Sequence, residues 1–395
     1  MRAEPAAVLS HFREILSRNR GCFFVALANL TQHRLRLVIA VLGTSVPIVL
    51  LLLQMAFLSG TRTQVTRFYD GFDFNIAVVA STYQFLVEGG TFDRVRLTQA
   101  HANPGVARTY SLNVASSNWT DKALDRRSTV LVFGVDDDPG FVRNGALRDG
   151  LALLRGNRSV LVDEFSASEF GSIAPGAVAT VGLQDVEVAG RFRLGLFFYA
   201  DGSVIMRNTD FARYTQRDPR EVSIGLIQVA GGASPETVRD ELARAMPFDV
   251  RILTRDELIA QERAFFITTK PIGIMLQISM WIAFLVGSVI LLQVLSTDIV
   301  NRLGEFATLK AMGFAPEFVF GIGLFQALLL ALSAFALAYA SGSAVLWIVE
   351  WATHLPAGIT PLLALATLLI VLAMCVLSAA VIVRRISQAD PAELY

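Results

Sequence analysis

The sequence has little charge and almost no cysteine for a chain of its length. Only 17% of the 395 residues are charged, whereas 53% are hydrophobic, and the mean hydropathy is positive. Soluble proteins of this size carry more charge, so the composition places the chain in a membrane. The formal net charge is zero, which gives no support to nucleic acid as a partner. With Cys22 and Cys375 as the only cysteines, the region between them must depend on a buried core and not on disulfides.

The sequence also lacks the motifs of common catalytic sites. It contains no G-x-x-x-x-G-K-[ST] loop for ATP phosphates, no G-x-S-x-G and no H-E-x-x-H. The four histidines are too scattered for a metal-binding pair on one helix: His11, His33, His101 and His354. Asp136-Asp137-Asp138 before Pro139-Gly140 could attract a cation, but this pattern is more typical of a solvated turn. We therefore expect a chain that is not an enzyme and has no catalytic, cofactor-binding or metal-binding residues.

Four long apolar runs predict transmembrane helices, at residues 37–58, 272–297, 317–348 and 361–383. At about 1.5 Å per residue, roughly 20 residues cross a hydrocarbon layer about 30 Å thick. Pro47 predicts a kink in the first run. In the third, the spacing of Ala334, Ala338 and Gly342 allows another helix to approach closely. The apolar cores of the runs contain no ionisable residue, which argues against ion-coupled transport and intramembrane proteolysis.

The distribution of arginine predicts the orientation in the membrane. Residues 1–36 are arginine-rich, and Arg384 and Arg385 follow the last span. Four spans place both ends on one side, and the arginines make that side the cytoplasm. The basic segment is either an interfacial helix on the inner leaflet or a plain basic tail. The loop 298–316 and the tail 384–395 are then also cytoplasmic, while residues 59–271 and the short loop 349–360 lie outside.

Residues 59–271 are long enough to form a separate domain. Alternating apolar runs predict strands at Phe74–Ala80, Val106–Ala115, Thr129–Val135, Val160–Asp163, Ala177–Leu183, Val186–Phe192, Ser203–Arg207, Val222–Val229 and Val250–Leu253. Helical patterns lie at Thr91–His101, Glu164–Phe170 and Ser234–Met246, and Thr254–Lys270 is expected to form a helical stalk that runs straight into the second span. The predicted fold class is a membrane α-helical protein with four transmembrane helices. A mixed α+β extracytoplasmic domain is inserted between the first and second spans.

A short polar insert, residues 296–314, separates the second and third spans. Leu303, Phe306, Leu309 and Met312 recur every three residues, which places them along one side of a helix. Gly313 can end this helix, and Pro316 prevents its continuation. So short a helix is not stable alone in water and needs a partner surface. From the spacing alone, an ordinary connecting loop is the favoured interpretation.

Five segments carry a resemblance to a known family: Ala28–Leu37 (A-N-L-T-Q-H-R-L-R-L), Val160–Gly171 (V-L-V-D-E-F-S-A-S-E-F-G), Val186–Gly202, Leu295–Phe314 (L-S-T-D-I-V-N-R-L-G-E-F-A-T-L-K-A-M-G-F) and Ala389–Tyr395 (A-D-P-A-E-L-Y). In the same order along the chain, they resemble segments of DevC-type permeases. These permeases belong to the MacB/FtsX superfamily of ATP-binding-cassette (ABC) membrane subunits. One departure is Gly304, which stands where a stiffer residue such as proline is expected.

The resemblance implies a homodimer in the bacterial inner membrane, served by a separate ABC ATPase subunit that binds ATP and Mg. It also implies a periplasmic membrane-fusion protein, a TolC-type outer-membrane channel, and contact with membrane lipids. The insert then becomes a coupling helix, with the ATPase contact at Arg302, Glu305, Phe306, Thr308, Leu309, Lys310, Met312 and Gly313. Its expected function is to couple ATP hydrolysis to motion of the outer domain and so export a lipid, glycolipid or other amphiphile. The alternative is an FtsX-like signalling subunit that activates a periplasmic partner without transport.

Overall fold

The computed structural model describes residues 34–388 except 123–125, 155, 157, 167–169, 194–199, 302–315 and 354–357, together with Phe24 and residues 26–28. The chain divides into two compact units. The helical unit comprises Met1–Ser59, Met275–Trp351 and Ala357–Tyr395, and the sheet unit comprises Gly60–Ile274 and Ala352–Pro356.

The strands of the sheet unit are β1 (Ile76–Ala80), β2 (Phe92–Asp93), β3 (Val106–Asp121), β4 (Arg126–Val135), β5 (Ser159–Asp163), β6 (Val178–Val181), β7 (Gln184–Phe192), β8 (Gly202–Arg207), β9 (Glu221–Val222), β10 (Ile224–Val229) and β11 (Val250–Thr254). Its helices are η1 (Leu86–Glu88), α3 (Val95–His101), η2 (Pro139–Phe141), α4 (Gly145–Leu151), α5 (Asn208–Thr215), α6 (Pro235–Ala245) and α7 (Arg255–Thr269). The last part of α2 (Arg34–Asp70) also belongs to this unit.

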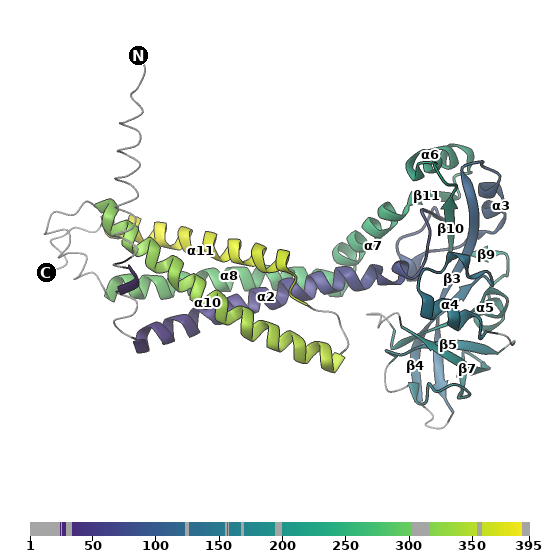
Figure 1. Cartoon of the computed structure of the whole chain (residues 1–395), viewed down its shortest axis with the longest axis horizontal. Helices are drawn as coiled ribbons and strands as arrows, with labels where there is room; N and C mark the ends of the chain where they lie inside the picture. The colour runs from purple at the N-terminus through teal and green to yellow at the C-terminus, as the bar shows by residue number, and fades with distance from the viewer. Residues whose placement is uncertain are drawn as a thin grey trace, which may run out of the picture. The chain divides into compact units, whose positions relative to one another are not determined.

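Nine of these strands form one mixed sheet in the order β11-β1-β10-β3-β4-β8-β5-β7-β6, and β2 pairs separately with β9. Figure 1 labels several of them, among them β11, β10 and β3. Most neighbours are antiparallel, but β4 pairs with β8, and β5 with β7, in parallel. Strand β3 is long enough to pair with different strands along its two halves. It pairs with β10 through Val106–Leu112 and with β4 through Leu112–Asp121, and its last residues also pair with β6.

Both faces of β1 are covered, which explains why its sequence I-A-V-V-A is apolar throughout. Ala77 and Val79 belong to a core that also contains Phe68 from α2 and Leu258 from α7. On the opposite face, Ile76 and Val78 of β1 enter another core. Helix α3 contributes Leu97 and Ala100 to this core, and α6 contributes Val238 and Leu242. Alternate residues of this strand therefore enter different cores, as the two-residue period of a strand requires.

A further core lies between the second half of β3, strands β4 to β8, and helix α5. Trp119 is fully buried there and packs with Phe170 and with valines of β5 and β7. The sheet unit therefore has separate cores under its two parts, and β3 connects them. This is a mixed α+β domain, as the sequence predicts.

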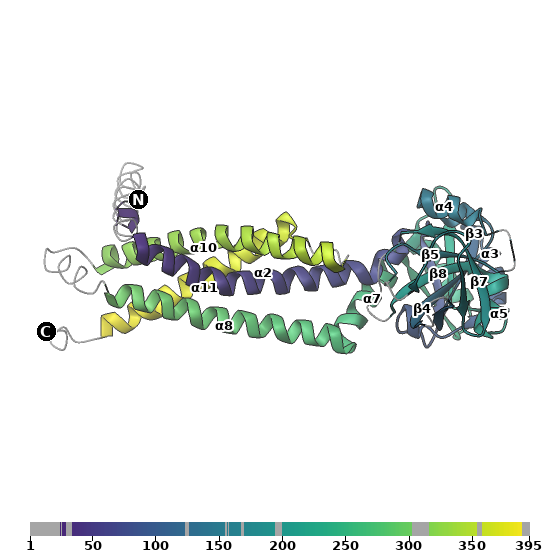
Figure 2. The ribbon, with the colours of Figure 1, turned by 90° about the horizontal axis from the view of Figure 1, so that it is seen from below.

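The helical unit contains the first part of α2, most of α8 (Pro271–Asn301) and α10 (Pro316–Thr353), and α11 (Pro361–Gln388). These helices run side by side in two perpendicular views (Figure 1, Figure 2). Among the described residues, four helices are long and apolar enough to cross a membrane: Leu37–Asp70, Pro271–Val294, Gly321–Trp351 and Pro361–Ser378. The predicted fold class is confirmed, because the α+β domain lies in sequence between the first of these helices and the other three.

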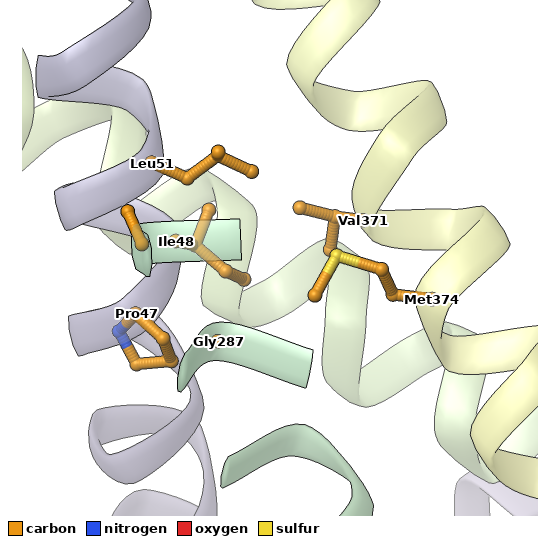
Figure 3. Close-up of a pocket in the computed structure, with 7 residues that line it drawn as sticks. Pro47, Ile48, Leu51, Gly287, Val371 and Met374 are labelled. Carbon is orange, nitrogen blue, oxygen red and sulfur yellow. The ribbon is translucent and has the colours of Figure 1, made fainter. Parts of the chain in front are cut away.

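Small side chains allow α10 to pack closely against its neighbours. Ala334 and Ala338 are fully buried, in a core shared with Ile48 of α2 and Val371 of α11. The close approach predicted from their spacing therefore occurs within this chain. Beside this core lies a small apolar recess lined by Pro47, Ile48, Leu51, Ala283, Gly287, Val371 and Met374 (Figure 3).

The structure confirms the predicted strands and adds several helices. Each predicted strand region contains a strand, although β3 continues six residues beyond Ala115 and Val222–Val229 divides into β9 and β10. The predicted helix at Ser234–Met246 corresponds to α6, and that at Thr91–His101 to α3, although its first residues form strand β2. Part of Glu164–Phe170 lies outside the described residues. Helices α4 and α5 were not predicted, because each is short and has few apolar residues in helical register.

Candidate functional site

The predicted contact with an ATPase lies outside the described residues. Arg302, Glu305, Phe306, Thr308, Leu309, Lys310, Met312 and Gly313 all fall within 302–315, between the end of α8 at Asn301 and the start of α10 at Pro316. Their role as a coupling helix stays a prediction from the sequence. The described residues nevertheless provide a candidate site, at the junction between α7 and α8 in the sheet unit.

Helix α7 has a strongly defined start. Thr254 accepts a hydrogen bond from the backbone N–H of Glu257, and the Glu257 carboxylate accepts one from the N–H of Thr254. This capping box satisfies two backbone donors at once. Because Thr254 is also the last residue of β11, the helix is fixed directly to the sheet.

The end of α7 corrects the prediction of a continuous rod into the second span. The helix ends at Thr269, and Lys270 has extended backbone angles, with φ −78° and ψ 138°. Pro271 is the physical reason, since a residue that precedes proline is displaced from the helical region. A new helix, α8, begins at Pro271, and its first turn closes with a hydrogen bond of 3.1 Å from Ile274 N–H to the Lys270 carbonyl. Proline suits this first position, where no backbone donor is required.

The two helices approach each other closely at this break, which we call the α7–α8 joint (Phe265–Ile274). A Cβ on Gly273 would lie 2.2 Å from the Phe266 carbonyl oxygen and 2.6 Å from the Ile267 Cα. Both of these atoms belong to the backbone, so they cannot be moved by a change of rotamer. Glycine at position 273 is therefore required for the observed fold of the joint.

Lys270 is held in the joint by aromatic rings and a carboxylate. Its Nζ lies 5.0 Å from the ring centre of Phe85 and 5.6 Å from that of Phe265, and these rings stack on each other. Glu88 forms an ion pair with the same Nζ. A cation over an aromatic face gains about 0.5–1 kcal/mol at exposed sites, so these contacts favour one arrangement of the joint without making it rigid.

In the middle of α7, before the joint, Glu262 is buried against α2 and the segment that follows β1. Its side chain is fully buried, and its Oε1 accepts hydrogen bonds from the hydroxyls of Tyr69, over 3.1 Å, and Tyr83. The two phenol oxygens lie 3.1 Å apart. We call these three residues the Tyr–Tyr–Glu cluster. It connects α2, the loop after β1 and α7 through buried side chains.

Sequence reasoning did not find Glu262, although a signal was present. Glu262 lies four residues after Leu258 and four before Phe266, and both of these neighbours are buried. An acidic residue at the centre of an apolar helical stripe is unusual, because a buried carboxylate needs compensating donors. The distant partners Tyr69 and Tyr83 could not be identified from the sequence.

The structure also explains the motif at Val160–Gly171. The indole ring of Trp119 stacks on Phe170, with ring centres 4.9 Å apart, and its Nε1 donates to the Phe170 carbonyl over 3.1 Å. Gly171 has φ +69°, and a Cβ there would lie 1.3 Å from Oδ2 of the buried Asp121. The end of the motif is thus fixed to β3 from two sides.

The acidic run at Asp136-Asp137-Asp138 has the structural role that the sequence favours. Asp136 accepts hydrogen bonds from the backbone N–H and hydroxyl of Ser111, and Asp137 pairs with Arg207. Asp138 accepts from the N–H of Gly140 and so forms a turn. Within the described part of the chain, no group of His, Cys, Asp or Glu side chains is arranged to hold a metal ion.

No curated protein matches the chain. Three solved structures resemble its fold at low identity. They are the extracellular domain of the noncanonic ABC-type transporter YknZ from Gram-positive bacteria (15% identity, TM-score 0.31), the periplasmic region of MacB from Actinobacillus actinomycetemcomitans (8%, 0.34), and a domain of a putative permease protein from Porphyromonas gingivalis (14%, 0.29). The matches cover 41%, 48% and 47% of this chain and 89%, 92% and 90% of those structures, respectively.

Family comparison gives the assignment. Residues 37–245 match the MacB-like periplasmic core domain, and residues 278–391 match the FtsX-like permease C-terminal region. The first match alone spans more than half of the sequence, and the two follow each other without overlap. The chain therefore belongs to the MacB/FtsX superfamily of ABC transporter permeases.

Proposed function

We propose that this chain is the non-catalytic permease subunit of a DevC-type ABC exporter. The observation that carries the proposal is that one chain contains the MacB-like core domain and the FtsX-like permease region in succession. The sequence contains no phosphate-binding loop for ATP. A separate ABC ATPase subunit then supplies the energy and holds ATP and Mg.

In the proposed arrangement, a homodimer lies in the bacterial inner membrane with its N- and C-termini in the cytoplasm. The sheet unit lies in the periplasm and works with a membrane-fusion protein and a TolC-type outer-membrane channel. The exported cargo is a lipid, glycolipid or similar amphiphile from the outer leaflet or periplasm. The arginine-rich residues 1–36 and the arginines at 384 and 385 support this orientation.

The coupling helix at 302–313 receives the motion of the ATPase, and α2 and α8 carry it along the chain. Both helices contain residues of the helical unit and of the sheet unit, so each provides a covalent path between the two. The path through α8 continues at the α7–α8 joint into α7, which begins directly after strand β11 of the sheet. A break at this point lets the sheet unit turn when α8 moves.

The double variant Glu305→Arg with Leu309→Asp tests the coupling helix. We expect it to reduce stimulation of the partner ATPase at least about tenfold, because a contact mostly buried against the ATPase tolerates neither a reversed charge nor an unpaired carboxylate. The measurement is ATP turnover of the complex reconstituted in lipid nanodiscs.

A matched control makes the same two kinds of change on the surface of the sheet unit, as Glu241→Arg with Leu183→Asp. Glu241 is exposed, and Leu183 is 85% exposed. This control is expected to keep normal turnover. Normal turnover in the Glu305/Leu309 variant would refute the coupling helix.

A pull-down from membranes distinguishes export from signalling. Recovery of a cell-wall hydrolase without a fusion protein would favour a signalling subunit over an exporter.

A further inference from the structure

The Tyr–Tyr–Glu cluster contains a carboxyl group that is only half satisfied. Both tyrosine hydroxyls bond to Oε1 of Glu262, while Oε2, also buried, has no hydrogen-bond partner among the described residues. An ionised carboxylate has about four acceptor sites and no donor. Burial with one oxygen unpaired therefore disfavours the charged form more strongly than the neutral one.

Within the described part of the chain, no ion pair involves Glu262, and no cation is among the groups that shift its pKa. The cationic side chains nearest the cluster bond to other groups: Arg255 to Asp70, Lys270 to Glu88, Arg263 to the carbonyl of Arg62, and Arg251 to Gln261 and the carbonyl of Tyr83. The hydroxyls of Tyr83 and Tyr69 are the groups that hydrogen-bond to the carboxyl. Burial raises the pKa of Glu262 to about 7, although these hydrogen bonds favour the charged form.

We propose that Glu262 is a proton-sensitive latch that holds α7 against α2 and the Tyr83–Glu88 segment. In its neutral form, the carboxyl fits the buried site beside the two phenols. When α7 separates from its neighbours, water reaches Glu262 and the carboxyl can ionise. Loss of the proton therefore favours the open arrangement, and gain of the proton favours the closed one.

The sign of the pH effect follows from the two states. In the open state the carboxyl has its ordinary pKa of 4.5, whereas in the closed state the pKa is about 7. Between these values the closed state binds more protons, so closure weakens as the pH rises through this window and changes little above it. A rise from pH 5.5 to 8.5 is expected to increase opening at least about tenfold.

Hydrogen exchange of the full chain in lipid nanodiscs tests the latch. After correction for the intrinsic pH dependence of exchange, amides of α7 and of the Tyr83–Glu88 segment should exchange faster at pH 8.5 than at pH 5.5, by about tenfold or more. Glu262→Gln keeps the shape but cannot ionise, so this difference should disappear. Asp256→Asn is the matched control, because Asp256 is an exposed carboxylate on the same helix and its loss should leave the difference unchanged.

A second variant keeps the test decisive if Glu262→Gln disturbs folding. Tyr83→Phe removes a donor that favours the charged carboxylate, so the exchange transition should move to higher pH. Infrared absorption of the protonated carboxyl should show the same shift. The latch is refuted if Glu262→Gln keeps the full pH difference, if Tyr83→Phe leaves the midpoint unchanged, or if Glu262 is already ionised at pH 5.5.

The role of the latch in controlling motion that passes from α8 to the sheet unit rests on the proposed function. The exchange experiment uses the permease chain alone, whereas the coupling helix is tested by ATP turnover of the complex. A pH-independent α7 with a normal response in the Glu305/Leu309 test would therefore remove only the latch. A pH-dependent α7 together with normal ATP turnover in the Glu305/Leu309 variant would refute only the coupling helix.

Discussion

Gly273→Ala should open the α7–α8 joint and lower the stability of the sheet unit. The new Cβ would lie 2.2 Å from the Phe266 carbonyl oxygen and 2.6 Å from the Ile267 Cα, so the backbone of one helix must move. Overpacking of this kind typically costs about 1–3 kcal/mol. For a unit of this size, each kcal/mol lowers the thermal midpoint by about 2–4 °C. Thermal unfolding in nanodiscs measures the loss, and hydrogen exchange of α7 locates it.

Gly287→Ala provides a control in the same helix. At this position a Cβ would lie 3.4 Å from the Pro47 Cβ and 3.7 Å from the Met374 Cε, which is ordinary contact beside the apolar recess (Figure 3). Both substitutions replace glycine by alanine in α8, but Gly287 lies in the helix interior, where alanine gains about 0.5–1 kcal/mol, whereas Gly273 lies in the first turn. A difference between the variants that clearly exceeds this gain therefore reports the steric clash. Equal midpoints would show that the joint does not need glycine.

The joint also shows what the sequence can and cannot predict. The charged pattern of Thr254–Lys270 predicts a helix, and α7 occupies almost the same residues. The break after it follows from Pro271, but the strong apolar pattern that begins at Ile272 favours a helix running through this residue. Proline displaces Lys270 from the helical region, and this local effect outweighs the preference of the apolar pattern for one continuous helix. The close approach of Gly273 to Phe266 depends on how two helices pack, and no periodicity shows it.

The strands were predicted well for a different reason. Alternation and apolar runs reflect burial on one or both faces, and strands such as β1 and β5 are short and almost wholly buried. The continuation of β3 to Asp121 was missed because S-S-N-W-T-D has a polar sequence. This segment is a strand because β4 and β6 pair with it and Trp119 enters the core. Tertiary pairing decided its structure against local preference.

The contacts of Trp119 and Asp121 in β3 with the end of the Val160–Gly171 motif lead to the other large effect, for Gly171→Ala. This substitution combines two penalties. At φ +69°, a residue with a Cβ costs about 1–2 kcal/mol relative to glycine. The Cβ would also lie 1.3 Å from Asp121 Oδ2, so the buried carboxylate must leave its position, which adds about 1–3 kcal/mol. We expect a loss of about 2–5 kcal/mol, measured by denaturant unfolding of the full chain, with hydrogen exchange of β3 as a local probe.

Gly176→Ala separates the two penalties. Gly176 has φ +88°, but no atom lies within 4 Å of the position that its Cβ would take. It should therefore show the backbone penalty alone, and the difference between the two alanine variants should equal the cost of displacing Asp121. Adding Asp121→Ala to Gly171→Ala should recover part of that difference, because the smaller side chain leaves room for the new methyl group. If the two glycine variants lose the same stability, Asp121 does not fix the end of the motif, and the Trp119–Phe170 contact alone holds it to β3.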